Sequence, residues 1–204
     1  MTESGTAADL PRGFFARDAE TVARDLLGCL LVRRTAAGEI LCRVVETEAY
    51  VGAHDLACHA SKGRTPRTDP MFGPAGRAYV YFVYGMHHML NVVTGPEGDP
   101  QAVLIRGASS WPPGAGRETA MAGPAKLCKA LGIETSLHNR MDLCTGSELA
   151  FRPRPTPLAE SVLATPRIGV DYAGEWAAKP LRFLLEGASG VSGRRIPTSA
   201  RQKG

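Results

Sequence analysis

One short stretch of the sequence places two carboxylates and an aromatic ring at the end of a segment with strand character. It reads Val44-Val45-Glu46-Thr47-Glu48-Ala49-Tyr50. Because side chains alternate between the two faces of a strand, Glu46 and Glu48 share one face with Val44. A carboxylate at the rim of an apolar face is costly unless cations or hydrogen-bond donors compensate it, so such a residue usually has a chemical role. The alternative is that the strand ends at Val45 and water solvates both glutamates.

The loop that follows carries side chains of the types that bind metal ions. His54, Asp55 and His59 lie in a segment whose glycines, prolines and polar residues exclude a long regular element. With Glu48 they could form a hydrolytic metal site, but their spacing matches no metal-binding pattern with a mechanical basis. We therefore expect no metal and no cofactor, and a metal-dependent hydrolase using His54 and His59 is the weakest hypothesis.

A helix and a hairpin precede and include the acidic stretch. Asp18 is a predicted N-cap, and apolar residues at helical spacing continue to Gly28, which stands where a helix commonly ends. Residues 29–34 and 40–47 have strand character, and the turn between them fits a hairpin of moderate loop length. The acidic stretch is therefore expected in the second strand of this hairpin.

The strongest strand signal of the sequence lies at residues 77–84, which are rich in aromatic and β-branched side chains. Together with residues 90–93 it predicts a second hairpin, whose tip carries Tyr84 and Met86. These two side chains bury nothing in their own sheet. They are therefore expected either to insert into a partner or to be covered by a neighbouring loop.

The second half of the chain supplies further elements. A strand at residues 102–106 delivers Arg106 at its end, and a loop rich in Gly, Pro and Ser is expected over residues 107–122. Gly123-Pro124 then opens a predicted helix that ends at Gly132. A short strand is expected within residues 142–152, and a closing strand at residues 181–185.

The composition suits one folded domain with a basic surface. The 204 residues are 44% hydrophobic, which is ample for a core. The net charge is only +4, but Lys62, Arg64 and Arg67 gather in one loop, which suits a polyanionic partner. Five cysteines without a C-x-x-C pair are typical of reduced core residues. No nucleotide-binding or serine-hydrolase motif occurs, which disfavours both classes.

The two ends of the chain differ in composition from the part between them. Residues 1–9 are expected to form a disordered leader and residues 189–204 a basic, disordered tail, with one domain at residues 10–188. No apolar run reaches transmembrane length, and the start lacks the features of a signal peptide. The sequence therefore predicts a protein that has no membrane segment and is not secreted. Its expected location is the cytoplasm, in association with the nucleoid, in a prokaryote, or the nucleus in a eukaryote.

Several motifs follow one another in order along the chain. They are Val45-Glu46-Thr47-Glu48-Ala49-Tyr50, Thr65-Pro66-Arg67, Met71-Phe72, Tyr79-Val80-Tyr81-Phe82-Val83-Tyr84-Gly85-Met86, Gly123-Pro124-Ala125-Lys126-Leu127-Cys128, Ala173-Gly174-Glu175-Trp176 and Lys179-Pro180-Leu181-Arg182-Phe183. Together they closely resemble the alkyladenine (3-methyladenine) DNA glycosylase family, over residues 14–184. The resemblance implies a single mixed α+β domain with a curved, largely antiparallel sheet, flanking helices and a protruding β-hairpin. It also implies a monomer that acts in base-excision repair on double-stranded DNA containing damaged purines.

The resemblance also implies roles in catalysis. Hydrolysis of an N-glycosidic bond needs an activated water and passes through a transition state with oxocarbenium character. Glu48 matches the family's general base, Arg106 matches the arginine that helps to hold the water, and the main-chain carbonyl of Val170 matches a third water ligand. Glu46 is expected to be structural. No lysine shares the strand with Glu48, which agrees with a monofunctional glycosylase without a lyase step.

Recognition of the base is implied in the same way. The damaged base must leave the stack, and Tyr50, His59 and Tyr81 match the family's aromatic pocket. Asn91 matches the pocket floor, where it would exclude guanine. A turn centred on Met86 places Asn91 opposite Tyr81, as that role requires, whereas a two-residue Gly85-Met86 turn places it opposite Val80.

The implied contacts with DNA lie on the second hairpin and the basic loop. Tyr84, together with Met86, matches the wedge that fills the gap left by the flipped base. The DNA backbone is expected to contact the basic residues Lys62, Arg64 and Arg67.

Some positions depart from the family pattern, and one other class of function stays open. His87 stands where some relatives have a bulkier aromatic residue, and the loops at residues 95–101 and 109–116 differ from the family. The resemblance therefore does not carry over to the contacts beside the wedge, the DNA footprint or the substrate range. The alternative function is a catalytically silent nucleic-acid-binding module on the same fold. Such a module could dispense with Glu48 and Arg106, yet both positions are filled.

Overall fold

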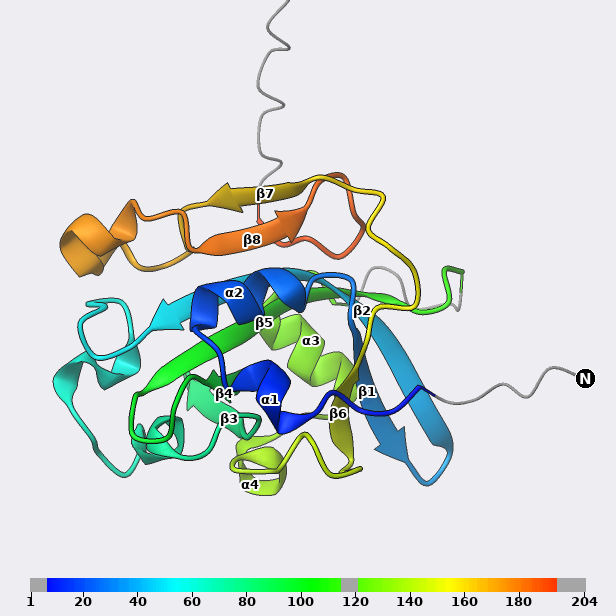
Figure 1. Ribbon diagram of the computed structural model, residues 1–204, viewed down its shortest axis with the longest axis horizontal. Helices are drawn as coiled ribbons and strands as arrows, with labels where there is room; N and C mark the ends of the chain where they lie inside the picture. Colours follow the sequence, from blue (N-terminus) through cyan, green and yellow to red (C-terminus); the bar gives the residue numbers. More distant parts are fainter. Residues whose placement is uncertain (1–6, 115–120, 194–204) are drawn as a thin grey trace, which may run out of the picture.

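A curled antiparallel sheet organises the computed structural model, which describes residues 7–114 and 121–193 (Figure 1). Within these residues the strand order is β3-β4-β5-β2-β1-β6, and β8 pairs with both β2 and β7. This arrangement confirms the predicted mixed α+β fold. The strands are β1 (Leu30–Thr35), β2 (Gly38–Val51), β3 (Ala78–Val83), β4 (His87–Thr94), β5 (Gln101–Ser110), β6 (Leu149–Arg152), β7 (Val162–Thr165) and β8 (Arg182–Leu185).

Strand β2 is the centre of the sheet. One edge of β2 pairs with β5, while the other pairs first with β1 and then, from Glu46 to Glu48, with β8. The strand continues to Val51, beyond the predicted end, and so carries both glutamates between two neighbours. The alternative that the strand ends at Val45 and leaves both glutamates solvated is therefore wrong. The turn from β1 is also tighter than predicted, because Thr35 pairs directly with Gly38.

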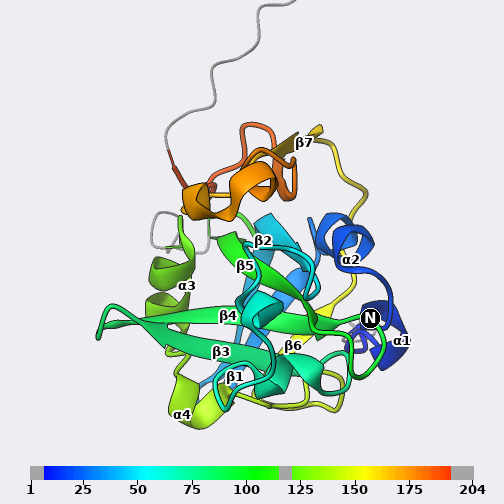
Figure 2. The same ribbon diagram turned by 90° about the vertical axis from the view of Figure 1, so that its left-hand side faces the viewer.

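Helices cover the two faces of the sheet. Figure 2 shows α2 (Ala19–Asp25) and α3 (Pro124–Leu131) on opposite sides, and each contacts β5. The short helices are α1 (Arg12–Phe15) and α4 (Thr135–His138), and the 3-10 helices are η1 (His59–Lys62), η2 (Asp69–Phe72) and η3 (Asp171–Ala177).

The predicted helix signals differ in how well they mark the observed ends. Asp18 caps α2 by accepting the Thr21 N–H at 2.8 Å. This helix ends before Gly28, because the chain turns at Leu26 and the N–H of Gly28 binds Val44 on β2. The limits of α3 agree with the prediction: it begins after Gly123 and ends at Gly132, which is left-handed with φ of 60°. Glycine is the usual residue there because it lacks a Cβ.

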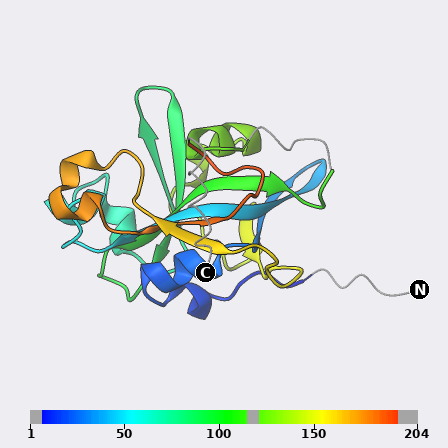
Figure 3. The ribbon, with the colours of Figure 1, turned by 90° about the horizontal axis from the view of Figure 1, so that it is seen from above.

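The β3–β4 hairpin projects from the body of the molecule (Figure 3). Its turn consists of Tyr84, Gly85 and Met86, and Val83 pairs with His87. Neither predicted register is correct, because the turn is centred one residue earlier and Asn91 pairs with Tyr79. Tyr84 itself has a φ of 53°, a conformation that is costly for a residue with a side chain, so the turn could not be placed from its glycine alone.

Some segments that were predicted to be irregular contain regular structure or make specific contacts. Strand β5 continues through Ser110, so the predicted loop begins later than residue 107, and part of it, residues 115–120, lies outside the described residues. Within the predicted leader, Asp9 pairs with Arg34 at 2.8 Å. Within the predicted tail, Ser192 is buried. Residues 1–6 and 194–204 lie outside the described part of the chain.

Candidate active site

The carboxylate of Glu48 is fully buried and is held by donors from three segments. Its Oε1 accepts the main-chain N–H of Ile168 at 2.8 Å, and its Oε2 accepts the hydroxyl of Tyr50 at 2.9 Å. The guanidinium of Arg106, on β5, approaches Oε2 at 3.3 Å. These contacts compensate the burial of a negative charge. The opposite face of β2 is apolar and packs on α2, where Thr47 binds the carbonyl of Ala23.

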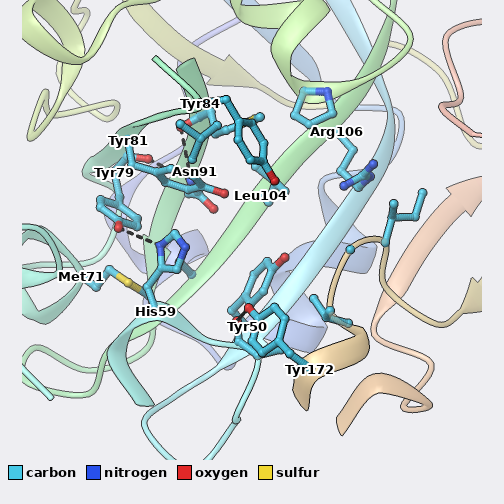
Figure 4. Close-up of a pocket in the computed structure, with 18 residues that line it drawn as sticks. Tyr50, His59, Met71, Tyr79, Tyr81, Tyr84, Asn91, Leu104, Arg106 and Tyr172 are labelled. Carbon is cyan, nitrogen blue, oxygen red and sulfur yellow. Dashed lines mark hydrogen bonds between the residues drawn. The ribbon is translucent and has the colours of Figure 1, made fainter. Parts of the chain in front are cut away.

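In front of this carboxylate lies a cavity of about 270 Å³. Tyr50 and Arg106 line the cavity (Figure 4). Both also contact Glu48, so its carboxylate lies behind the cavity wall. The structure brings most of the predicted site residues to this one place. Its lining includes Tyr50, His59, Met71, Tyr79, Tyr81, Tyr84, Asn91, Leu104, Arg106, Val170 and Tyr172.

Aromatic rings form one wall of the cavity. The rings of His59 and Tyr81 meet edge to face with centroids 4.6 Å apart, and the His59 Nδ1 lies 3.0 Å from the hydroxyl of Tyr79. Burial, with a smaller contribution from Arg67, lowers the pKa of His59 to about 4. Burial and then the charge of Glu48 raise the pKa of Tyr50 well above its usual value. At neutral pH His59 is therefore uncharged. Tyr50 stays protonated, so its hydroxyl can donate the hydrogen bond to Glu48.

Asn91 lines the cavity in spite of the corrected register. It pairs with Tyr79 across the hairpin, and since Tyr79 and Tyr81 are two residues apart on β3, all three side chains share a face. The Asn91 Nδ2 donates to the carbonyls of Tyr79 at 3.0 Å and Met89 at 3.4 Å. Its side chain is 3% exposed and is held in one orientation.

The tip of the hairpin presents large apolar side chains to solvent. Tyr84 is 87% exposed and Met86 is 68% exposed, so no loop among the described residues covers them. His88, for which the sequence suggests no role, packs against the ring of Phe82 and accepts the N–H of Thr135, the first residue of α4. It thus fastens the hairpin to the body.

The three residues that are predicted to contact the DNA backbone lie near the cavity but have different partners within the protein. Arg64 pairs with Asp69 at 2.6 Å, so its charge is partly neutralised. Arg67 lies over the ring of Tyr81, 5.6 Å from its centroid. Lys62 ends η1 and, with Arg67, lines a second cavity of about 320 Å³ next to His59.

Behind the cavity lies a buried ion pair that the sequence does not predict. Asp55 and Arg167 have no side-chain exposure and form a two-point pair, and Arg167 also donates to the carbonyl of Ala49 at 2.9 Å. The guanidinium lies 4.8 Å from the ring centroid of Tyr50. The next residue, Ile168, donates to Glu48. No local pattern links residues so far apart in sequence, so nothing short of the fold reveals this pair.

The side chains of the metal hypothesis have separate partners. His54 packs against Trp176, His59 contacts Tyr79, and Asp55 binds Arg167. The described residues contain no group of three or more His, Cys, Asp and Glu side chains that could hold a metal ion. They also contain no helix long and apolar enough to cross a membrane.

A cavity with aromatic walls and a buried, arginine-paired carboxylate behind it suit a hydrolase that binds a flat ring. Comparison with known sequences identifies the family within this class. The pattern of the methylpurine-DNA glycosylase (MPG) family matches residues 13–189. The chain belongs to this family of DNA-repair glycosylases.

Three relatives show how much of the chain the similarity covers. A protein of Myxococcus xanthus (strain DK1622) is 54% identical over 197 residues, which cover 92% of this chain and 98% of that protein. A protein of Anaeromyxobacter dehalogenans (strain 2CP-C) is 51% identical, with 90% and 86% covered. A protein of Methanocella arvoryzae is 48% identical, with 91% and 96% covered. Each carries the name "Putative 3-methyladenine DNA glycosylase".

Proposed function

We propose that this protein flips alkylated or deaminated purines, of the 3-methyladenine, hypoxanthine and ethenoadenine type, out of duplex DNA. It then hydrolyses the N-glycosidic bond with a water activated by Glu48 and leaves an abasic site. The observation that carries this proposal is the position of Glu48, fully buried and bound by two residues that line an aromatic cavity.

The carboxylate serves two needs of the reaction. It accepts a proton from the attacking water, and its charge stabilises the oxocarbenium character of the sugar in the transition state. Arg106 helps to hold the water, and the carbonyl of Val170, at the cavity wall, supplies a further acceptor. Among the described residues, no lysine lines the cavity, which supports simple hydrolysis without a Schiff base.

The walls of the cavity suit the electronic character of damaged purines. Alkylation leaves a purine electron-poor and often cationic, and the π faces of Tyr50 and Tyr81 attract such a ring. The neutral state of His59 adds no positive charge that would repel it. A flipped base can thus be held by stacking while Glu48 acts on its sugar.

The test is incubation of the protein with duplex oligonucleotides that carry hypoxanthine, 3-methyladenine or ethenoadenine. We expect strand breaks at the lesion only after alkali treatment, because the product is an abasic site. Breaks without alkali would indicate a lyase. Tight binding of lesion DNA without any abasic product would instead support the silent binding module.

Replacement of the exposed tyrosine at the hairpin tip should weaken capture of the flipped state. Tyr84→Ser removes the ring that fills the vacated stack, a contact worth about 1–3 kcal/mol. We expect single-turnover excision to slow correspondingly, while binding to undamaged duplex changes little. Val162→Ser, a partly exposed apolar position on β7, is the matched control. Excision by Tyr84→Ser at the wild-type rate would refute the wedge.

Shortening of the amide at the cavity floor should relax discrimination against guanine. Asn91 would meet the purine edge where guanine has an amino group and hypoxanthine has only hydrogen. Relief of a buried polar mismatch is worth about 1–3 kcal/mol. In Asn91→Ser the ratio of guanine to hypoxanthine excision should therefore rise by about 5- to 150-fold.

The ratio is measured as single-turnover rates on duplexes that differ only at the target base. The control is Asn139→Ser, because Asn139 also binds a main-chain group of the hairpin, the N–H of Val80, but lies outside the cavity lining. An unchanged ratio in Asn91→Ser would remove the selectivity role.

A further inference from the structure

Beside the proposed catalytic carboxylate lies a second carboxylate that the mechanism does not use. Glu46 is fully buried on β2, two residues before Glu48. Its Oε1 accepts the Nε of Arg182 at 2.6 Å, the hydroxyl of Ser192 at 2.9 Å and the Nε of Arg106 at 3.1 Å. Its Oε2 accepts the N–H of Ser192 at 2.6 Å. Four donors, two of them from arginines, therefore compensate the burial of this carboxylate.

Arg106 is shared between the two glutamates. Its Nε binds Glu46, its Nη1 faces Glu48 at 3.3 Å, and its Nη2 donates to the hydroxyl of Ser192 at 3.2 Å. Each of the three guanidinium nitrogens therefore has a partner, and the orientation of Nη1 toward Glu48 follows from the other two contacts. The donors of a guanidinium have a fixed planar geometry, so fixing two of the nitrogens directs the third.

Arg182 balances the charge of this cluster. It stands on β8 opposite Glu48 in the strand register, and its side chain binds Glu46 and the carbonyl of Ser192, at 2.8 Å. Two carboxylates thus face two guanidinium groups. Without Arg182, Glu46 would keep only Arg106 as an ion-pair partner, and Arg106 also pairs with Glu48.

The backbone of the segment that carries Ser192 packs closely against β5, next to Arg106. A Cβ on Gly107 would collide with the carbonyl of Gly190, and one on Gly190 would collide with the carbonyl of Ala108. Gly190 also has a φ of 93°. Only glycine permits this approach without displacement of the backbone, and the approach brings Ser192 within reach of Glu46.

We propose that Glu46 and Arg182 are positioning residues: they aim Arg106 at Glu48 and, by balancing each other's charge, set the electrostatic field in which Glu48 binds or releases its proton. The proposal rests on the assignment of Glu48 as the base. The groups that contact Glu48 or interact electrostatically with it are Arg106 from β5, Arg167 from the segment before η3, Tyr81 from β3 and Tyr50 from β2. Glu46 shares Arg106 with Glu48, and Arg182 lies opposite Glu48 in the strand register.

The charge balance predicts opposite effects for its two members. Arg182→Met leaves an excess negative charge beside Glu48, so Glu48 should bind a proton at higher pH. Glu46→Gln leaves an excess positive charge, so Glu48 should bind its proton at lower pH. Each shift should be roughly one pH unit, as for a neighbouring charge that is gained or lost. The double variant, Glu46→Gln with Arg182→Met, restores the charge balance. Its Glu48 should therefore bind a proton at nearly the same pH as in the wild type.

Two measurements read these shifts. Proton binding by Glu48 is followed directly by NMR of protein labelled with ¹³C at the glutamate carboxyl groups, with the signal assigned by its loss in Glu48→Gln. The acid limb of single-turnover excision is recorded on hypoxanthine duplex. If the wild type does not excise, the proposed function fails, and the NMR titration still decides the present proposal.

The matched control is Arg152→Met. Arg152 is also a buried arginine with a two-point glutamate partner, Glu39, but it lies on β6, away from the cavity. We expect this variant to lose stability without moving the titration of Glu48. If Arg182→Met does not fold, Glu46→Gln, which keeps the side-chain shape, decides by itself. Shifts of Glu46→Gln and Arg182→Met in the same direction, no shift in Glu46→Gln, or an equal shift in Arg152→Met would overturn the proposal.

Discussion

Glu48→Gln should reduce single-turnover excision of hypoxanthine by about 100- to 10,000-fold, as removal of a general base commonly does. Glutamine keeps the shape of the side chain but can neither accept the proton of water nor supply negative charge to the transition state. Tyr50 and Arg106, which contact both Glu48 and the cavity, are unchanged. Binding of lesion DNA should therefore persist and is measured by titration of labelled duplex under the same conditions.

The control for this loss is Glu39→Gln. Glu39 lies on the same strand, β2, but pairs with Arg152 and Arg34 outside the cavity. Its variant should excise at nearly the wild-type rate. If Glu48→Gln retained activity within a few-fold of the wild type, another carboxylate would have to be the base, and Glu46 is the nearest in the buried cluster.

Arg167→Met should lower the free energy of unfolding by about 3–5 kcal/mol, because it leaves the carboxylate of Asp55 buried without its cation. Asp55 has no side-chain exposure, and the N–H groups of Val51 and Ala57, which also bind it, do not neutralise its charge. The loss is measured by urea denaturation followed by fluorescence or circular dichroism.

An exposed ion pair provides the comparison. Arg24 pairs with Glu20 across one turn of α2, and both side chains are more than 40% exposed. Arg24→Met should therefore cost less than about 1 kcal/mol. Equal losses in the two variants would mean that the buried pair contributes no more to stability than an exposed one, which would contradict the prediction.

Local patterns in the sequence were sufficient for several elements. Asp18 predicts the start of α2, and Gly123-Pro124 with Gly132 predicts both ends of α3, because helix termini are satisfied by residues next to them in sequence. Alternation along β2 correctly places Glu46 and Glu48 on one face, as their common partner Arg106 shows. The motifs that resemble the glycosylase family correctly indicate the family and the mixed α+β fold.

Other features depend on contacts between distant segments. The hairpin register follows from a positive φ at Tyr84, which no residue preference predicts. The end of α2 is set by the bond from Gly28 to Val44 on a neighbouring strand.

The sequence by itself determined which residues are chemically able to act, the periodicity of the elements that carry them and the family. Only the tertiary structure decided how the acidic residues are compensated. Asp55 meets Arg167, and Glu46 meets Arg106 and Arg182, after the sheet has brought together β2, β5, β8 and the segment around Ser192. Partners for a buried charge are chosen by proximity in space, and chain patterns that repeat every two or four residues contain no information about pairs more than fifty residues apart.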